Sequence, residues 1–429
     1  MNNLRGHPRT GSNVVTQQIE ASGDPDLTLL LPECDVEDPE LSIVIPSLNE
    51  EITIATFVAW CKQGIADAGI AAEILIIDSS KDRTAEIAVA NGARVLRTPR
   101  RGLGRAYIDA LPFIRGRYIL MGDADCTYDF RDIRHFIEEF RRGAEFVMGS
   151  RFKGSIEDGA MPALHRYFGT PLTTWILNVM YRTHFTDIHC GMRGITRDGF
   201  ERMRLTSQSW EYASEMVLKS VHLGLLTSEV PVRFLKDQNG RLSHHARAGW
   251  FSAWHAGWIN LKAMFVFGAD FFLMIPGGLL LGLGLIPLLV LLRGPIMVGG
   301  LTLSLNTMLL SLIVSSVGLQ LLLSGVIAQT LYDQIGVRRR KWISLFDYTK
   351  MVAVSALFVL IGLIAELRFA AAFAESNYQM RDSLIELNHQ SVFGLFLIIC
   401  GVQTFVSTLM VQAIGLHVPL IGSNISKQD

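Results

Sequence analysis

Residues 117–130 read RYILMGDADCTYDF, an apolar strand that runs directly into two carboxylates, Asp123 and Asp125. Residues i and i+2 of an extended backbone point to the same side, so both side chains are expected to project together from the end of the strand. Such a pair suits a hard divalent cation, which takes oxygen ligands and leaves places for substrate phosphates. The motif is weak when taken alone, because a solvated turn after a buried strand has the same pattern.

Composition places part of the chain in lipid. Of the 429 residues, 49% are hydrophobic and 18% are charged, which is more apolar than a typical soluble protein. The formal net charge of -1 gives no global basic field, so no nucleic-acid partner is expected. The cysteines lack C-x-x-C spacing, which predicts neither a disulfide framework nor a zinc site and favours a reducing, cytosolic environment: Cys34, Cys61, Cys126, Cys190 and Cys400.

Between residue 41 and about residue 234, short apolar runs alternate with helix-like stretches. Strands are predicted at 41–46, 73–78, 93–96, 118–122 and 145–148, and helices at 50–68, 83–91, 105–114 and 130–142. Apolar strands separated by helices of this size predict a parallel sheet that is covered on both faces. In such folds ligands bind outside the carboxyl ends of the strands.

Polar residues follow three of these predicted strands at that edge. They are Pro46, Asn49 and Glu50, then Asp78, then Asp123 and Asp125. Local alternatives exist for two nearby residues, since Asn49 is also a candidate helix N-cap and Asp82 a candidate turn acceptor. The turn at 101–104 has two possible interpretations, a loop whose backbone amides bind a phosphate or a plain strand-to-helix turn.

Four apolar segments, 271–292, 306–331, 351–365 and 391–416, are predicted to cross the membrane as helices. Glu366 and Arg368 follow the third segment directly, so a spanning helix would place these two residues near an interface. Basic residues at 338–341 lie between the second and third segments, so the positive-inside rule predicts that this loop, both termini and the α/β domain are cytosolic. Contact with the bilayer surface is also expected for the uncharged stretch 170–180 and for a helix that carries Trp250, Trp254 and Trp258 on one face.

The order of the motifs resembles that of family 2 glycosyltransferases of the dolichyl-phosphate mannosyltransferase type. The motifs are SIVIPSLNEE (42–51), IIDSSKDRT (76–84), RRGLGRA (100–106), GDADCTYDF (122–130), GSRFKG (149–154), MPALHRYFGT (161–170), TDIHCGMRGI (186–195) and VPVRF (230–234). The resemblance implies a GT-A (Rossmann-like) α/β domain that binds a nucleotide sugar, followed by an all-α transmembrane domain of four helices. It also implies inverting transfer of a hexose, from UDP-glucose or GDP-mannose, to an undecaprenyl or dolichyl phosphate in the presence of Mg²⁺ or Mn²⁺.

The resemblance also assigns residues by position. Nucleotide-sugar binding falls to Pro46, Asn49, Glu50, Asp78 and Asp123, the metal to Asp125, and catalytic roles to Asp123, Asp125 and Asp187. Acceptor-phosphate binding falls to Arg151, Arg166, Thr170, Arg193 and Arg241, and Glu215 matches a further motif. Arginine forks suit phosphate oxygens, although each of these arginines could equally form an ion pair.

The sequence departs from the family pattern at three places. The usual D-D-G-S-x-D-x-T is DSSKDRT at 78–84, the frequent Gly-Asn is Gly169-Thr170, and the R-x-G-x-S-K turn ends in His244 instead of lysine, so that Arg241 or His244 would have to replace it. Two other functions stay open. One is a lipid-linked-sugar flippase or scaffold with a nucleotide-sugar-sensing domain, and the other is a synthase of another membrane glycan.

These expectations divide the chain into five parts. They are a flexible arm (1–40), the GT-A domain (41–244), an amphipathic juxtamembrane helix (245–265), the transmembrane domain (266–418) and a C-terminal tail (419–429). The expected protein is an integral membrane enzyme with its catalytic domain in the cytosol. Whether it forms a homo-oligomer is left open.

Overall fold

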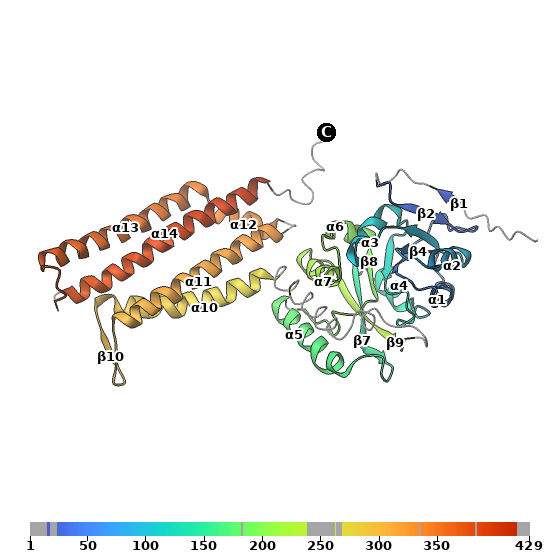
Figure 1. Cartoon of the computed structure of the whole chain (residues 1–429), viewed down its shortest axis with the longest axis horizontal. Coiled ribbons are helices and arrows are strands. Elements are labelled where there is room, and N and C mark those ends of the chain that lie inside the picture. Colours follow the sequence, from blue (N-terminus) through green and yellow to red (C-terminus); the bar gives the residue numbers. More distant parts are fainter. Residues whose placement is uncertain are drawn as a thin grey trace, which may run out of the picture. The chain divides into compact units, whose positions relative to one another are not determined.

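The computed structural model describes residues 15–17, 24–181, 183–237, 262, 268–333, 336–381 and 384–417. The chain divides into two compact units, residues 1–264 and 265–429. The strands of the first unit are β1 (Val15–Gln17), β2 (Thr28–Leu31), β3 (Leu41–Ser47), β4 (Ala72–Asp78), β5 (Arg94–Arg97), β6 (Tyr118–Met121), β7 (Phe146–Ile156), β8 (Arg193–Thr196) and β9 (Thr227–Phe234) (Figure 1). Its α-helices are α1 (Ile54–Ala68), α2 (Thr84–Ala90), α3 (Leu103–Ala110), α4 (Arg134–Arg141), α5 (Thr170–Tyr181), α6 (Arg197–Met203) and α7 (Tyr212–His222).

The strands form one mixed sheet in the order β1-β2-β5-β4-β3-β6-β8-β7-β9. The predicted parallel pairing is correct for β5, β4, β3 and β6. It is wrong farther along, because β8 runs antiparallel between β6 and β7. The sequence RGIT of β8 begins with an arginine and contains no apolar run, so nothing in its pattern signals a strand. Since β8 is antiparallel to both neighbours, β6 and β7 point the same way and their carboxyl ends share one edge.

The amino-terminal segment differs from the expected flexible arm. β2 pairs antiparallel with β5 at the side of the sheet, and Leu27 and Leu29 are buried. The run LTLLL at 27–31 supplies the apolar side chains for this strand, although Gly, Pro and acidic residues surround it. Residues 1–14 and 18–23 lie outside the described residues.

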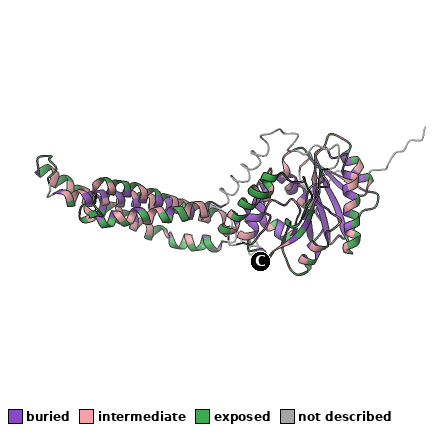
Figure 2. Ribbon diagram, turned by 90° about the horizontal axis from the view of Figure 1, so that it is seen from below, coloured by how far each residue is buried: buried purple, intermediate pink, exposed green. Residues whose placement is uncertain are grey.

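Burial of the central strands places the core of this unit on the sheet. Leu41, Ile43, Val44 and Ile45 of β3 have no exposed surface, and Figure 2 shows the strands coloured as buried. β3 and β4 pair along their whole length, from Leu41 opposite Ala72 to Ser47 opposite Asp78. This register brings the ends of the two strands to the same level, which positions the first part of the site.

The second unit is a helical bundle. Its elements are α10 (Ala269–Val290), β10 (Ile296–Val298), β11 (Leu301–Leu303), α11 (Leu305–Tyr332), α12 (Val337–Leu345), α13 (Tyr348–Glu375) and α14 (Ile385–His417). Four of its helices, α10, α11, α13 and α14, are long and apolar enough to cross a membrane, which confirms the four predicted segments. The third helix continues well past Glu366, whose carboxylate accepts a hydrogen bond from Ser391 Oγ of α14 at 2.8 Å.

Small residues let these helices approach closely. A Cβ added at Gly318 of α11 would lie 2.2 Å from the amide nitrogen of Leu281, and one at Gly362 of α13 would lie 2.4 Å from the carbonyl oxygen of Gly394. Close crossings of this kind are typical of helices that associate in lipid. The juxtamembrane helix predicted at 245–265, including Trp250, Trp254 and Trp258, and the tail at 419–429 fall among residues that are not described, except for residue 262.

Candidate functional site

Asp78 lies at the carboxyl end of β4 and is held by neighbours of its own loop and of β3. Its Oδ1 accepts hydrogen bonds from Ser47 Oγ at 2.9 Å and from the Ser80 amide at 3.3 Å. The side chain is only 2% exposed. Burial raises the pKa of Asp78, while the hydrogen bonds from Ser80 and Ser47 oppose that rise. This carboxylate is therefore positioned by neutral donors at the edge where ligands bind in parallel sheets.

Asn49 joins the loop after β3 to the loop after β4. Its backbone amide donates to Ser80 Oγ at 2.7 Å, and its side-chain Oδ1 accepts from the backbone amide of Lys81 at 3.1 Å. It adopts a left-handed backbone conformation with φ of 57°, which asparagine tolerates better than most residues. The alternative role as a helix N-cap is wrong, because α1 begins at Ile54 and its N-cap is Thr53.

The neighbouring residues complete this loop pair. Glu50 is buried, its amide donates to Thr84 Oγ1 at 3.0 Å, and its Oε2 accepts from Thr53 Oγ1 at 3.1 Å. Asp82 Oδ1 accepts from the Thr84 amide at 3.0 Å, so its alternative role as a turn acceptor is correct. Pro46 lies inside β3 and is partly exposed.

Asp123 and Asp125 follow β6, but not on extended backbone. The strand ends at Met121, Asp125 lies in a turn, and the next residue, Cys126, has a φ of 60°. The i, i+2 argument for a shared direction therefore does not apply at this point. Asp125 is oriented instead by Thr127, whose amide and hydroxyl both donate to Asp125 Oδ1, at 3.0 and 2.6 Å.

The loop before β8 runs directly beside Asp123. A Cβ added at Gly191 would lie 2.7 Å from Asp123 Oδ2, so a larger residue there would displace the Asp123 carboxylate. The Gly191 amide donates to the hydroxyl of Tyr128 at 2.8 Å, which ties this loop to the turn that carries the two carboxylates. Neither Gly191 nor Tyr128 was predicted as a site residue, although both lie inside the quoted motifs.

The donor set fits a metal that arrives with its ligand. Among the described residues, no group of three or more His, Cys, Asp or Glu side chains is placed to hold a metal ion. Mg²⁺ commonly uses only one or two carboxylates together with substrate phosphates and water. Asp125, with Asp123 two residues before it, meets that smaller requirement.

Arg151 and Asp187 form a buried ion pair between β7 and the loop before β8. Arg151 Nε donates to Asp187 Oδ2 at 2.6 Å and Nη2 donates to Oδ1 at 2.8 Å, while the two residues are 8% and 0% exposed. Burial opposes the charge, but Tyr128 and Asp187 outweigh it and raise the pKa of the Arg151 guanidinium. The ring of Phe234, at the end of β9, lies 5.2 Å from the guanidinium carbon.

A second carboxylate, that of Glu229, holds the loop that carries Asp187. Glu229 of β9 accepts hydrogen bonds from the amides of Thr186 and Asp187, at 2.8 and 3.1 Å, and it pairs with Lys153 Nζ at 2.8 Å. Asp187 is thus fixed through both its backbone and its side chain. Within the described residues Arg151 Nη1 makes no hydrogen bond, so this nitrogen is the part of Arg151 suited to an incoming anion.

Arg166 is presented differently. It lies in a π-helical turn, His165–Gly169, just before α5, is partly exposed, and stacks over Tyr167 at 5.6 Å. Thr170, the first residue of α5, is buried. Large apolar side chains of the same segment face outward, namely Leu164 (61% exposed), Tyr167 (74%), Phe168 (61%) and Trp175 (62%).

Arg193 and Glu215 have partners inside the protein. Arg193 is 1% exposed and donates to the carbonyl oxygens of Cys190 and Ala213, at 2.5 and 2.9 Å. Glu215 has no exposed surface and pairs with Lys219 Nζ at 2.6 Å. Arg193 therefore ties the loop before β8 to α7, and Glu215, which also accepts from the amides of Thr206 and Ser207 at 2.9 and 2.8 Å, ties the loop before α7 to that helix. Arg241 and His244, the two candidates for the missing lysine, lie outside the described residues.

The glycines at 101–104 serve close packing. A Cβ at Gly102 would lie 2.2 Å from the carbonyl oxygen of Gln208, and one at Gly104 would lie 2.2 Å from that of Ser207. The Arg105 amide already donates to the carbonyl oxygen of Gln208 at 3.1 Å. The plain-turn alternative thus accounts for this motif.

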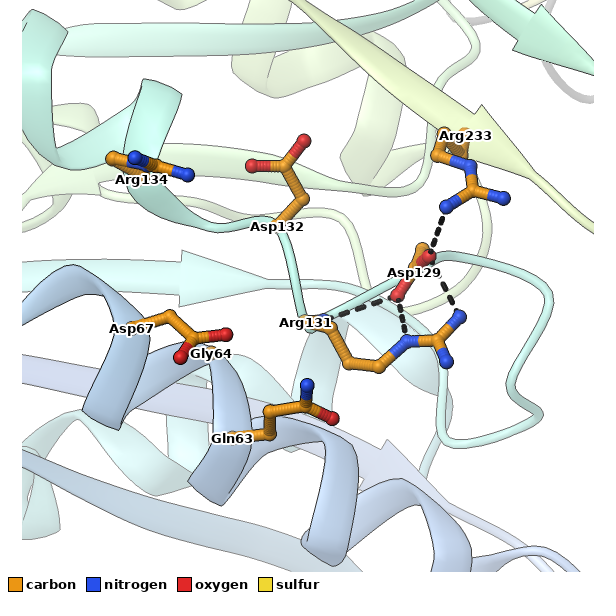
Figure 3. Close-up of a pocket in the computed structure, with 8 residues that line it drawn as sticks. All are labelled: Gln63, Gly64, Asp67, Asp129, Arg131, Asp132, Arg134 and Arg233. Atoms are coloured by element: carbon orange, nitrogen blue, oxygen red, sulfur yellow. Dashed lines mark hydrogen bonds and ion pairs between the residues drawn. The ribbon is translucent and has the colours of Figure 1, made fainter.

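A hollow of about 470 Å³ lies between α1 and the loop that precedes α4, apart from the predicted site residues (Figure 3). Its lining is Gln63, Gly64, Asp67, Asp129, Arg131, Asp132, Arg134 and Arg233. Asp129 accepts from Arg131 Nε at 2.7 Å and pairs with Arg233 Nη1 at 3.2 Å, so its charge is compensated within the protein.

Comparisons with known proteins agree with this architecture. Glycosyl transferase family 2 matches residues 42–204, and the Glycosyltransferase family 2 C-terminal transmembrane region matches residues 327–415. The Low-salt glycan biosynthesis hexosyltransferase Agl6 of Haloferax volcanii is 37% identical over 320 residues, which are 74% of each chain. A Dolichyl-phosphate hexose transferase of the same organism is 27% identical over 46% of this chain and 82% of its own length.

A solved structure is also similar, that of mannosyl-3-phosphoglycerate synthase from Rubrobacter xylanophilus. It has 23% identity and a TM-score of 0.41, over 52% of this chain and 72% of that one. The family matches and the extent of the hexosyltransferase relative support one conclusion. This chain is an enzyme that belongs to glycosyltransferase family 2, with a GT-A catalytic domain and the C-terminal transmembrane region of that family.

Proposed function

We propose that the enzyme transfers a hexose from a nucleotide sugar, UDP-glucose or GDP-mannose, to a polyprenyl phosphate in the membrane, with inversion at the anomeric carbon. The observation that carries this proposal is the shared edge of the sheet. Asp78 and the Asp123–Asp125 turn lie at the ends of β4 and β6, and Arg151 lies on the codirectional β7. Two relatives support it, one named a hexosyltransferase and the other a dolichyl-phosphate hexose transferase.

The donor would bind at the parallel half of this edge. Asp78, Asn49 and Glu50 are held in place by hydroxyls and amides of the two loops and would contact the nucleoside. Asp125 would hold Mg²⁺ or Mn²⁺ on the diphosphate, and that cation would neutralise the charge that develops on the leaving group. Thr127 fixes the direction of the Asp125 carboxylate before the donor arrives.

The acceptor needs little chemical activation. A phosphomonoester has a second pKa of about 6, so at pH 7 its oxygen is already largely an anionic nucleophile. The task of the protein is then to hold two anions near each other, for which arginines are suited. Arg166, partly exposed beside outward apolar residues, and Nη1 of Arg151 would bind the acceptor phosphate.

The same segment would bring the acceptor to the site at the membrane surface. The outward apolar side chains of residues 164–175 would contact the bilayer, and four membrane-crossing helices keep the enzyme there. The basic α12 would face the cytosol, which places both termini and the catalytic domain on the side where nucleotide sugars are found.

The test is a search for the product. Purified full-length protein is incubated with polyprenyl phosphate, Mg²⁺ or Mn²⁺ and a panel of nucleotide sugars, and lipid-linked sugars are identified by mass spectrometry. A polyprenyl-phosphate hexose from one donor is the expected result. Binding of nucleotide sugar without product from any donor would overturn the proposal and favour a sensing scaffold.

A further inference from the structure

The connection between α10 and α11 is a β-hairpin made of β10 and β11. Its register pairs Val298 with Leu301, which leaves Gly299 and Gly300 as a two-residue turn. Both glycines have positive φ, 54° and 86°, as a type I′ turn requires. The local sequence thus specifies a hairpin here, not an irregular loop.

The tip of this hairpin is apolar and exposed. Ile296 and Leu303, at its base, pack against the buried cluster of Leu288, Leu291 and Met308. Beyond the base, Met297 is 76% exposed, Val298 55% and Leu301 70%. Cross-strand neighbours share a face, so Met297 and Thr302 lie on one face and Val298 and Leu301 on the other. Apolar side chains therefore project from both faces.

The sequence around the hairpin contains no charge. Residues 294–332 include no Asp, Glu, Lys, Arg or His. Strand edges that face water usually carry charged residues, often lysine, and an isolated two-stranded hairpin is marginally stable in water. This composition is the one expected of a hairpin that meets lipid.

The direction of the hairpin is also consistent with contact with lipid. Figure 1 shows it leaving the end of α10 and α11 across the helix axes. Helices that cross a bilayer run roughly along the membrane normal, so a hairpin that crosses their axes extends along the membrane surface. Its unpaired amide and carbonyl groups must stay within reach of water, which limits its depth to the headgroup region and the first part of the acyl chains.

We propose that the β10–β11 hairpin is an interfacial lipid anchor, with Met297, Val298 and Leu301 inserted into the leaflet at the end of the bundle opposite α12. The adjoining ends of α10 and α11 also expose apolar side chains, namely Leu289, Val290 and Leu310. A second copy of the chain, paired edge to edge, would cover the strand edges but leave the side chains on both faces exposed. Lipid covers both faces at once. The proposal does not depend on the reaction that the enzyme catalyses.

Site-directed spin labelling tests this directly. Cys34 is exposed and the other four cysteines are buried, so a Cys34→Ser background allows one new cysteine to be labelled. Labels are placed at Met297→Cys and, as a control, at Met380→Cys, which is 53% exposed in the connection between α13 and α14. The full chain is reconstituted into nanodiscs of phosphatidylcholine and phosphatidylglycerol, and collisions with O₂ and with a water-soluble nickel chelate are measured.

The expected result is a ratio of O₂ to nickel accessibility that is several-fold higher at position 297 than at position 380. Water-like accessibility at both positions would overturn the proposal. Dipolar broadening between labels at position 297 of two copies would also overturn it, in favour of self-association. Val298→Asp combined with Leu301→Asp should move the label at 297 toward the water-like ratio, whereas the exchange Val298→Leu with Leu301→Val should leave it unchanged.

Discussion

The carboxylates at the ligand-binding edge have different partners in the two halves of the sheet. In the parallel half, Asp78 receives its hydrogen bonds from a hydroxyl and an amide, and Thr127 supplies the same two kinds of donor to Asp125. In the half that contains β7, β8 and β9, Asp187 is paired with Arg151 and Glu229 with Lys153. Neutral donors orient a carboxylate without cancelling its charge, whereas an arginine or lysine compensates it inside the protein.

This difference separates two uses of the same side chain. A carboxylate that neutral donors orient at the ligand-binding edge is suited to a cation brought by a ligand. One that is compensated by a buried arginine mainly maintains structure, and its loss leaves an unpaired cation behind. We therefore expect activity to be most sensitive to changes at the edge that carries Asp78 and Asp125, and stability to be most sensitive to loss of the Arg151–Asp187 pair.

Asp125→Asn should have the largest effect. Asparagine can still accept the hydrogen bonds from Thr127, so the fold should persist, but the charge for the metal is lost. We expect turnover to fall by about 100- to 1,000-fold, the range for loss of one electrostatic contact to a transition state. Product is quantified by mass spectrometry with excess Mn²⁺, and Asp132→Asn, an exposed residue of the separate hollow, serves as the control. Normal activity of Asp125→Asn after metal removal would contradict the mechanism.

Asp187→Ala should affect stability more than a change at Asp78 or Asp125. It leaves Arg151 buried without its partner, which costs about 3–5 kcal/mol of the free energy of unfolding. The matched variant is Asp78→Asn. Burial raises the pKa of Asp78, so the folded state disfavours the charged carboxylate. The stability that the protonated form contributes is therefore lost as pH rises through the folded pKa.

At neutral pH, removing the charge of Asp78 should therefore leave stability unchanged or increase it. The measurement is the unfolding midpoint of both variants and of the parent protein in the same detergent. Similar losses in Asp187→Ala and Asp78→Asn would show that the two halves do not differ in this way.

Arg166→Ala should have a smaller effect, confined to the acceptor. Arg166 is partly exposed, so its loss should leave the fold intact and remove one charge-assisted hydrogen bond to phosphate. Such bonds contribute about 1.5–3 kcal/mol, so KM for polyprenyl phosphate should rise about tenfold or more while kcat changes little. Arg134→Ala removes an exposed arginine from the separate hollow and is the control. A lower kcat with an unchanged KM would argue against acceptor binding by Arg166.

The same contrast explains how far the sequence could be interpreted. In the parallel half, each polar residue follows its own strand, so Asp78 and Asp125 could be placed at the edge from short-range pattern alone. In the other half, the partners of Arg151 and Asp187 depend on β8 and β9, whose pairing joins segments far apart in the chain. No local pattern shows that Asp187 faces Arg151 or that Glu229 supports its loop. Gly191 and Phe234 were missed for the same reason.

His189 allows a test of the smallest expected effect, that of burial and nearby charges in the half of the sheet that contains β7, β8 and β9. Burial, with help from Arg151 and Arg193 and against the charge of Asp187, lowers the pKa of this imidazole to about 4. Its Nε2 lies 2.8 Å from Thr173 Oγ1, so the neutral ring joins the loop to α5. A histidine whose folded pKa lies below its unfolded value of about 6.5 binds fewer protons when folded, so stability falls as pH drops from 6.5 toward 4.

Glutamine keeps a hydrogen-bonding side chain but does not titrate, so the unfolding midpoint of His189→Gln should decline less steeply than that of the parent over that range. The difference between the two proteins should be smaller than the loss of midpoint caused by Asp187→Ala. Parallel curves for the parent and His189→Gln would mean that neither burial nor the arginines oppose protonation of the ring in the folded state. A steeper decline in the parent alone would show that burial, together with the cations Arg151 and Arg193, disfavours the protonated ring of His189 in the folded state.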